Sequence, residues 1–283
     1  MPGYRFCRTD DLGLLADAYN RCIAAHVPGA PALTAERLKR RGRNVDFWAS
    51  SSMLAFGDDG PIGVLLAAKR TAATCLLAVG LHPDHRRQGH ARHLLGSLAQ
   101  KLEILGPPRL IFEVDATDAA THGLLAACGW RETGELADLV RESETHAAPR
   151  PPQALPDLAT PVTFDELAAV GTIGSCESWT RARATLKRRA GELEGLAILS
   201  DRVEAFCLFE HGPDGAELSI AALGAPGSDA ALAPLVDALA ARGAARLRIP
   251  RLGTDEVSID LLAALGFRSE RRWSRFSLDV SVG

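Results

Sequence analysis

A glycine-containing loop in the first half of the sequence carries its clearest chemical signal. Residues 81–91 read LHPDHRRQGHA, between an apolar run and a stretch with helical spacing. If a helix starts near Gly89, the backbone N–H groups of residues 87–92 have no intrahelical partner and stand at the positive end of the helix dipole. Gly89 and Ala91 leave room for a diphosphate to approach these groups, and Arg86 adds positive charge nearby. The loop therefore predicts a binding site for phosphate groups.

This loop needs a strand before it and a helix after it. Residues 74–81 form a strand-like apolar run, and leucines recur at three- and four-residue steps over residues 89–105, which predicts an amphipathic helix. Further strands and helices are expected at residues 4–8, 11–25, 34–41, 52–56, 62–69, 110–114, 118–128 and 130–140. Strands that come first, followed by strand, helix, strand and helix, predict a mixed sheet flanked by helices, of the α+β (α/β mixed sheet) class.

The second half of the sequence repeats the first. Residues 54–81 match residues 196–223 at one constant offset, and residues 124–130 match residues 261–267. Apolar patterns can agree by chance, but ordered matches over several elements indicate an internal duplication.

A proline-rich stretch separates the two copies. Five prolines lie between residues 149 and 161, in a segment with few large apolar side chains. Such a composition is typical of a linker, and a length of 283 residues is suited to two domains. We therefore predict one domain at residues 1–144, a linker at residues 145–162 and a second domain at residues 163–283.

The second copy has lost the features of the phosphate loop. Residues 223–231 read LGAPGSDAA, which is shorter than the first loop and contains no arginine. Asp229 would repel a phosphate group. We expect this copy to be structural, with weak phosphate binding or none.

These features resemble the GNAT superfamily of N-acyltransferases, in a tandem arrangement with a degenerate second copy. The family's hallmark is similar to L-x-P-x-x-R-x-x-G-x-A at residues 81–91, followed by a strand and helix at residues 113–130. The resemblance implies acetyl-CoA as the donor, with its pyrophosphate on the loop and its pantetheine arm beside residues 79–81, like an added strand. The residues implied to bind it are Val79, Leu81, Arg86, Arg87, Gln88, Gly89, His90, Ala91, Arg92 and Asp118.

Two positions depart from the family's pattern. Asp118 stands where many members have Asn, and as a helix N-cap it has a structural role of its own. Leu125 stands where many members have the Tyr that protonates the leaving thiolate. His122 shares a helix face with both and is our candidate acid, although it could equally be a surface histidine.

The general base has several candidates. His82 follows the cofactor strand, Glu113 lies on the next strand and Asp115 comes just after it. Each could relay the proton of the attacking amine through water, and Glu113 could equally face solvent or pair with an arginine. The resemblance places Tyr19 and the loop at residues 26–31 in the region that shapes the acceptor site.

We therefore expect an N-acetyltransferase that moves an acetyl group from acetyl-CoA to an amine of a small-molecule acceptor. The alternatives are a non-catalytic acyl-CoA-binding or sensor protein and a structural protein in which both copies have decayed. A net charge of −3 without a basic stripe argues against nucleic-acid binding, and six scattered cysteines indicate no metal site. No apolar run is long enough to span a membrane and no secretory signal is recognisable, so we expect a cytoplasmic protein.

Overall fold

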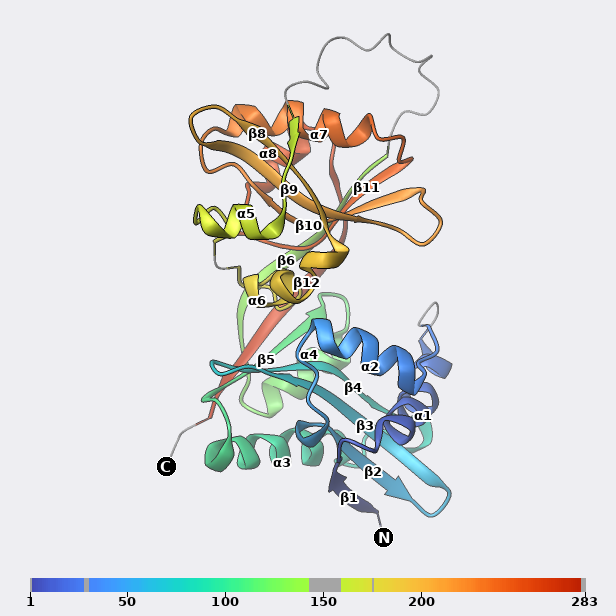
Figure 1. The fold of residues 1–283 in the computed structure, drawn as a ribbon. Helices are drawn as coiled ribbons and strands as arrows, with labels where there is room; N and C mark the ends of the chain where they lie inside the picture. The colour runs from blue at the N-terminus through green and yellow to red at the C-terminus, as the bar shows by residue number, and fades with distance from the viewer. Residues whose placement is uncertain (1, 28–30, 143–158, 175, 281–283) are drawn as a thin grey trace. The chain divides into compact units, whose positions relative to one another are not determined.

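The computed structural model describes residues 2–27, 31–142, 159–174 and 176–280 (Figure 1). Contacts between Cα atoms divide the chain into a first unit, Met1–Thr133 with Ser274–Gly283, and a second unit, Gly134–Trp273. Each unit is a mixed sheet with helices packed against it, so the predicted α+β class is confirmed. None of the described helices is long and apolar enough to cross a membrane.

The sheet of the first unit has the strand order β1-β2-β3-β4-β5, followed by the end of β12. Its elements in chain order are β1 (Gly3–Phe6), α1 (Leu12–Cys22), α2 (Ala35–Asn44), β2 (Met53–Gly57), β3 (Gly60–Lys69), β4 (Thr74–Leu81), α3 (His90–Leu105), β5 (Arg109–Asp115) and α4 (Ala119–Ala127). Most predicted elements therefore lie within a few residues of the observed ones.

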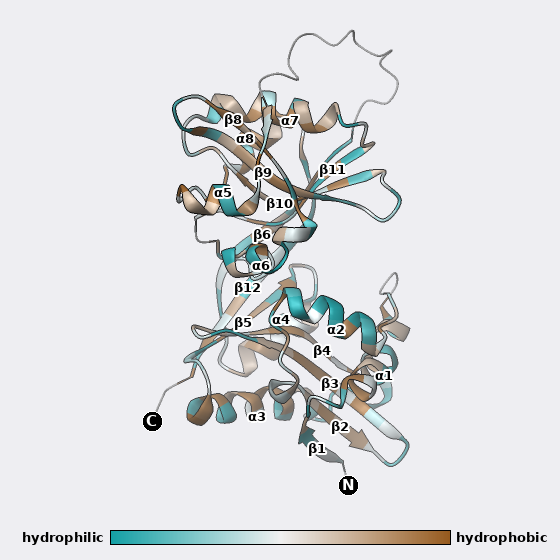
Figure 2. Ribbon diagram, viewed as in Figure 1, coloured by the Kyte–Doolittle hydropathy of each residue, from teal (hydrophilic) through white to brown (hydrophobic). Residues whose placement is uncertain are grey.

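Apolar side chains cover both faces of this sheet. On one face, Leu94, Leu98 and Leu102 of α3 pack with strand residues into one core cluster. On the other face, α1 contributes Leu15 and α2 contributes Leu38 to a second cluster. The remaining surface of α2 is hydrophilic, whereas the strands beside it are largely hydrophobic (Figure 2). The two-sided packing explains why β3 is buried over most of its length.

The second unit repeats this plan with the strand order β6-β11-β10-β9-β8-β7. Its elements are β6 (Arg131–Glu142), β7 (Ala159–Pro161), α5 (Phe164–Ala169), α6 (Arg183–Arg188), β8 (Glu194–Leu199), β9 (Val203–His211), β10 (Glu217–Gly224), α7 (Leu232–Ala240), β11 (Arg246–Gly253), α8 (Ile259–Ala264) and β12 (Arg268–Asp279). In both units three antiparallel strands are followed by one parallel pair, β4 with β5 and β10 with β11. The tandem arrangement is therefore confirmed.

The two units exchange their last strands, so the contact-defined division differs from the predicted domains at residues 1–144 and 163–283. Strand β6 follows the first unit's α4 in sequence but pairs with β11 of the second unit. The end of β12 belongs to the first unit, where Phe276 and Val280 join the core and the Val280 N–H donates to the Pro108 carbonyl. Both strands have similar apolar patterns, so the sequence could not assign each strand to its sheet.

Part of the predicted linker is structured. Residues 159–161 form β7, which pairs with β8 at the edge of the second sheet. Residues 145–158 of the predicted linker lie outside the described residues.

Candidate functional site

Strands β4 and β5 of the first unit part after a short parallel pairing. Their register runs from Thr74↔Leu110 to Leu76↔Phe112 and ends there. Immediately beyond it, Leu77 is an extra residue in β4 relative to β3, which is a β-bulge. A bulge bends its strand, and residues 77–80 are more exposed than the buried residues before them. An accessible strand edge therefore begins where the pairing with β5 stops, which we call the first slot.

The first slot leads into the predicted phosphate loop. The His82 N–H donates to the Ile62 carbonyl, a short 3-10 turn follows at Pro83–His85, and α3 starts at His90 with Gly89 as its N-cap. The first bond inside the helix runs from the His93 N–H to the Gly89 carbonyl. The N–H groups of residues 90–92 therefore precede the hydrogen-bonded part of the helix, as the sequence predicted.

The backbone of this loop is shaped to leave its amides accessible. Arg87 has φ 62° and Gly89 has φ 87°, both in the left-handed region that favours glycine. A Cβ added at Gly89 would meet no atom within 4 Å, so the space above it is open. An anion can therefore approach the helix N-terminus without displacing other groups.

The side chains predicted to bind the cofactor fall into two groups. Arg86, Arg87 and Arg92 are exposed, and the Arg86 Nε donates to the Leu81 carbonyl at 3.2 Å, which holds this side chain against the loop. The Gln88 Nε2 donates to the Asp84 carbonyl at 3.0 Å. His90 differs, since its side chain is 7% exposed and faces the core. Only its backbone N–H is available to a ligand.

Tyr4 holds the His90 side chain in this position, and sequence reasoning missed it. The Tyr4 hydroxyl lies 2.6 Å from His90 Nδ1, and the Tyr4 ring lies against His93 with centroids 3.9 Å apart. Tyr4 is on β1, far from the loop in sequence, so no spacing pattern could have linked the two.

His82 lies at the end of β4, beside the first slot. Its Nδ1 is buried and has no hydrogen-bond partner among the described residues, since Asp84 Oδ2 is 3.6 Å away. The His82 ring lies edge-on to His26, with centroids 5.3 Å apart. The structure thus brings His82 together with the start of the predicted acceptor loop, of which residues 28–30 lie outside the described residues. Tyr19 of α1 is partly buried against the core on that face.

The candidates on β5 and α4 are less suited to chemistry. His122 Nε2 is 3.0 Å from the Asp115 carbonyl, so only Nδ1 of this ring remains for proton transfer. Asp118 caps α4, with Oδ1 accepting from the Thr121 N–H at 3.0 Å and Oδ2 from its hydroxyl at 2.6 Å. Leu125 is fully buried in the core. The described contacts do not bring His122 to the first slot as a substitute acid.

Glu113 remains a candidate by its position on β5. It follows the last residue of β5 that pairs with β4 and is partly exposed. It therefore lies on the part of β5 that diverges from β4.

The second unit has a slot of the same design between β10 and β11. Their register ends at Ser219↔Arg248, and Ala221 is an extra residue in β10. The loop that follows is closed, because the N–H groups of Gly227 and Ser228 donate to the Glu204 carbonyl at 3.1 and 3.2 Å. The Glu204 side chain also occupies the space where a Cβ on Gly227 would lie. An anion would meet a carboxylate in place of accessible amides.

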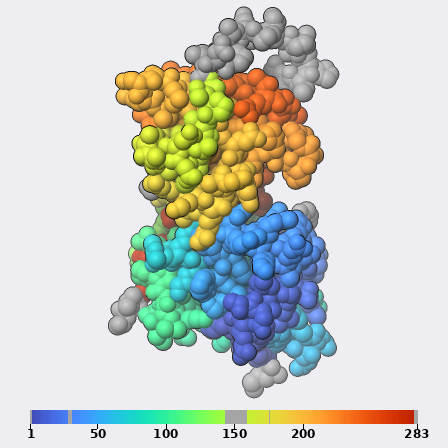
Figure 3. Space-filling model, viewed as in Figure 1, coloured from blue at the N-terminus to red at the C-terminus, as the bar shows by residue number. Residues whose placement is uncertain are grey.

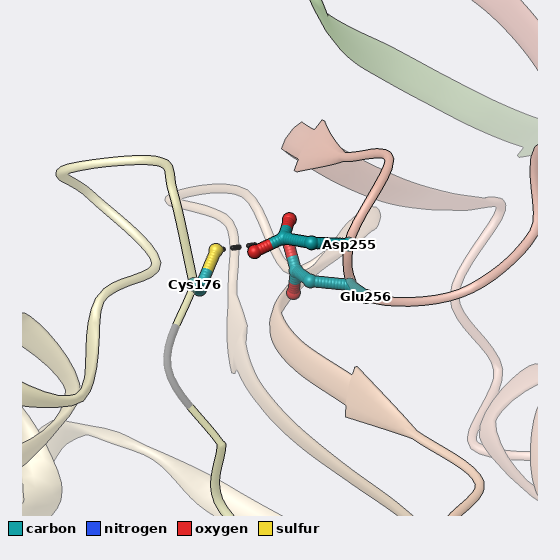
Figure 4. Close-up of side chains that lie close together, drawn as sticks. All are labelled: Cys176, Asp255 and Glu256. Carbon is teal, nitrogen blue, oxygen red and sulfur yellow. Dashed lines mark hydrogen bonds between the residues drawn. The ribbon is translucent and has the colours of Figure 1, made fainter. Parts of the chain in front are cut away.

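A cysteine and two carboxylates lie together in the second unit. Figure 4 shows Cys176 facing Asp255 and Glu256, and the ligand atoms of these residues lie within 4.8 Å of one another. Burial, and then the charge of Glu256, raise the pKa of the Cys176 thiol far above its usual range, so the thiol stays protonated at neutral pH. The Arg181 guanidinium binds both oxygens of Glu256. This donor set therefore does not fit a cation, which needs a thiolate and an unneutralised carboxylate.

Comparisons with known proteins agree with this geometry. Residues 19–130 match the family model described as Acetyltransferase (GNAT) family. No curated protein sequence matches the chain.

Solved structures match over the whole chain at low sequence identity. A GCN5-related N-acetyltransferase from Sphaerobacter thermophilus is 16% identical with a TM-score of 0.68, over 100% of this chain and 96% of that chain. The tandem GNAT protein from the clavulanic acid biosynthesis pathway is 15% identical with a TM-score of 0.64, over 99% of both chains. A putative acetyltransferase from Pyrococcus horikoshii is 14% identical with a TM-score of 0.62, over 99% of this chain and 90% of that chain. These likenesses show the fold of both units.

Proposed function

Because residues 19–130 are a GNAT acetyltransferase domain, we propose that the first unit transfers an acetyl group from acetyl-CoA to the amine of a small molecule. The observation that carries this proposal is the continuity of the first slot with the loop. The accessible edge at residues 77–81 leads directly to the amides of residues 89–92, which arginines flank. An extended amide chain with a diphosphate at one end is complementary to such a surface.

The cofactor's diphosphate would bind at the start of α3. The N–H groups of residues 90–92 would donate to its oxygens, and Arg87 and Arg92 would supply positive charge. Hydrogen bonds to charged groups contribute about 1.5–3 kcal/mol each, so a few of them can account for micromolar binding. The pantetheine amides would pair with the edge of β4 at Val79 and Leu81. His90 would contribute its backbone alone, because its side chain bonds to Tyr4.

We assign the role of general base to His82. The attacking nitrogen must lose a proton when its bond to the thioester carbon forms and the carbon–sulfur bond breaks. His82 Nδ1 has no other partner among the described residues and lies at the end of β4, where the thioester would be. A water molecule can link the amine to this nitrogen. Glu113 is the second candidate for this role.

The leaving thiolate needs no dedicated acid in this scheme. The position of the usual Tyr is Leu125, which is buried in the core. An ordinary thiol has a pKa near 8.5, so the thiolate is a tolerable leaving group near neutral pH and can take its proton from solvent. We expect the rate of turnover to depend on this step.

The acceptor would enter from the side of α1. His26 and His82 lie together there, and Tyr19 lies on the adjoining helix. The α1 side therefore supplies the groups that we propose contact the acceptor amine.

A non-catalytic acyl-CoA-binding or sensor protein is the second candidate. The buried Leu125 favours it, because a protein that only binds the cofactor needs no acid at this position. Turnover separates the two functions, since both predict acetyl-CoA binding.

The first experiment is isothermal titration of acetyl-CoA into the wild-type protein and the Gly89→Glu variant. We expect micromolar binding that the variant loses, because the new side chain brings bulk and negative charge into the loop. Gly129→Glu is the matched control, because Gly129 also has a positive φ, of 81°, and open space around it. Retained binding in Gly89→Glu would contradict the assigned cofactor site.

Thiol release in the presence of a panel of small amines then tests catalysis. Acetyl-dependent thiol release with at least one amine supports the transferase. Acetyl-CoA binding without turnover of any amine would favour the sensor.

A further inference from the structure

The slot of the second unit contains a side chain of the chain itself. Arg181 precedes α6 and is 2% exposed. Its Nη1 donates to the Ile220 carbonyl on β10 at 2.8 Å and to the Pro250 carbonyl on β11 at 3.2 Å. Both carbonyls lie just beyond Ser219↔Arg248, the last pair between these strands. The guanidinium therefore bridges the two strands at the point where they part.

A buried carboxylate holds the guanidinium in place. The Glu256 oxygens accept from Arg181 Nε at 2.8 and 2.9 Å and from Nη2 at 2.8 Å. Glu256 also accepts from the Gly253 N–H at 3.1 Å and lies 3.1 Å from Cys176 Sγ. The charges of Arg181 and Glu256 are thus paired and hydrogen-bonded on both sides, which is the condition for burying an ion pair without a large penalty.

The slot is larger than the guanidinium that occupies it. A cavity of about 240 Å³ lies against Arg181, lined by the end of β10 at residues 222–224, by Ile173 and by Phe206. The segment of α5 and α6 covers this part of the second unit, in yellow-green and yellow in Figure 3. The second unit therefore keeps the space of a ligand slot as well as its strand geometry.

We propose that Arg181 is an internal occupant of the second slot and takes the place that the amide arm of acyl-CoA takes in the first slot. This inference rests on the proposed function only in placing that arm along β4. In the second unit, a donor from the chain satisfies the Ile220 carbonyl that a cofactor amide would otherwise reach. The chain then binds one acyl-CoA, and removal of Arg181 opens a site for small amide or guanidinium compounds.

Thermal unfolding of Arg181→Ala tests this proposal, with Arg183→Ala as the matched control. Arg183 is exposed and lies in the same segment. We expect Arg181→Ala to lower the Tm by roughly 10 °C, because it leaves Glu256 as an unpaired buried charge, and Arg183→Ala to change it by about 1 °C at most.

Two small probes then distinguish a slot occupant from an ordinary ion pair. Methylguanidinium and pantetheine, which lacks phosphate, should each restore part of the lost Tm in Arg181→Ala, and should leave the second unit unchanged in the wild type and in Arg183→Ala. An ion pair without a ligand slot behind it would respond to methylguanidinium alone. Failure of pantetheine to raise the Tm of Arg181→Ala therefore overturns the proposal.

A double variant covers the case in which Arg181→Ala does not fold. Arg181→Met with Glu256→Met removes both charges together, and replacing a buried ion pair by apolar side chains is often tolerated. The same pantetheine response is expected, and its absence overturns the proposal. Two acetyl-CoA molecules per wild-type chain in the titration would overturn it as well. No binding to the wild type would instead contradict the proposed function and leave the probe result to decide the role of Arg181.

Discussion

The two slots share their strand geometry and differ in what satisfies their polar groups. In each unit, three residues of each central strand pair in parallel before the strands part beside a bulge. The first slot leaves the loop amides open at Gly89, whereas the second closes them with Glu204 and bridges its strands with Arg181. The comparison shows that a slot can lose its ligand only if the chain supplies replacement partners.

The physical reason is the cost of unsatisfied polar groups. A buried donor or acceptor without a partner costs about 1–3 kcal/mol, a large share of the stability of one domain. In a unit that binds a cofactor, the cofactor and solvent satisfy these groups. In the second unit, the Glu204 carbonyl and the Arg181 guanidinium do so. Decay of the second slot therefore required gains as well as losses.

The largest expected difference between the slots concerns the end of the central strand. His82 ends the first slot, and the repeat places Gly224 at the equivalent position, where the Phe206 ring leaves no room for a Cβ. We expect His82→Ala to lower kcat about 100-fold with little change in the KM for acetyl-CoA, because general bases contribute factors of this size. Steady-state kinetics with the best amine of the panel measures it. An unchanged kcat would move the role of base to Glu113.

A smaller effect is expected from the arginines that the second loop lacks. Replacing Arg87 and Arg92 together by Ala should weaken acetyl-CoA binding about 10-fold, because both side chains are exposed and partly screened by solvent. The loss should shrink in high salt. Titration at low and high ionic strength checks both points, with exposed Arg131→Ala as the control. Equal affinities for the double variant and the control would mean that the loop amides alone hold the phosphates.

Tyr4→Phe tests the support beneath the first loop. The substitution removes the hydroxyl that lies 2.6 Å from His90 Nδ1 and leaves the ring packing in place. We expect acetyl-CoA affinity to fall about threefold, because the loss of one hydrogen bond of roughly 0.5–1.5 kcal/mol loosens the start of α3. Calorimetry measures the affinity, and Tyr19→Phe is the control. If only the Tm changes, Tyr4 supports the fold and not the loop.

The smallest effect is expected at Glu204 of the second loop. Hydrogen bonds from Ser200 and Arg202 lower the pKa of this carboxyl, so its contribution to stability is present above the ordinary Glu pKa and is lost as the pH falls through the lowered folded-state value. Glu204→Gln should therefore lower the Tm slightly at neutral pH and by less in acid. Thermal scans across this pH range measure the difference. The same loss at every pH would show that the charge of Glu204 has no role in closing the loop.

The sequence determined the features that depend on neighbouring residues. Leucine spacing placed α3, the glycine after Arg86 and Arg87 placed the phosphate loop, and the match between the halves revealed the duplication. Asp118 was expected to cap α4 and does so. Helix periodicity, capping and turn chemistry act over a few residues, so they can be recognised without the fold.

Only the tertiary structure decided which distant segments meet. The exchange of β6 and β12, the support of His90 by Tyr4 and the insertion of Arg181 between β10 and β11 all join residues far apart in the chain. Many edge strands and many buried arginines would fit the same local pattern equally well. The choice among them depends on which arrangement satisfies every buried polar group at once, and that condition involves the whole chain.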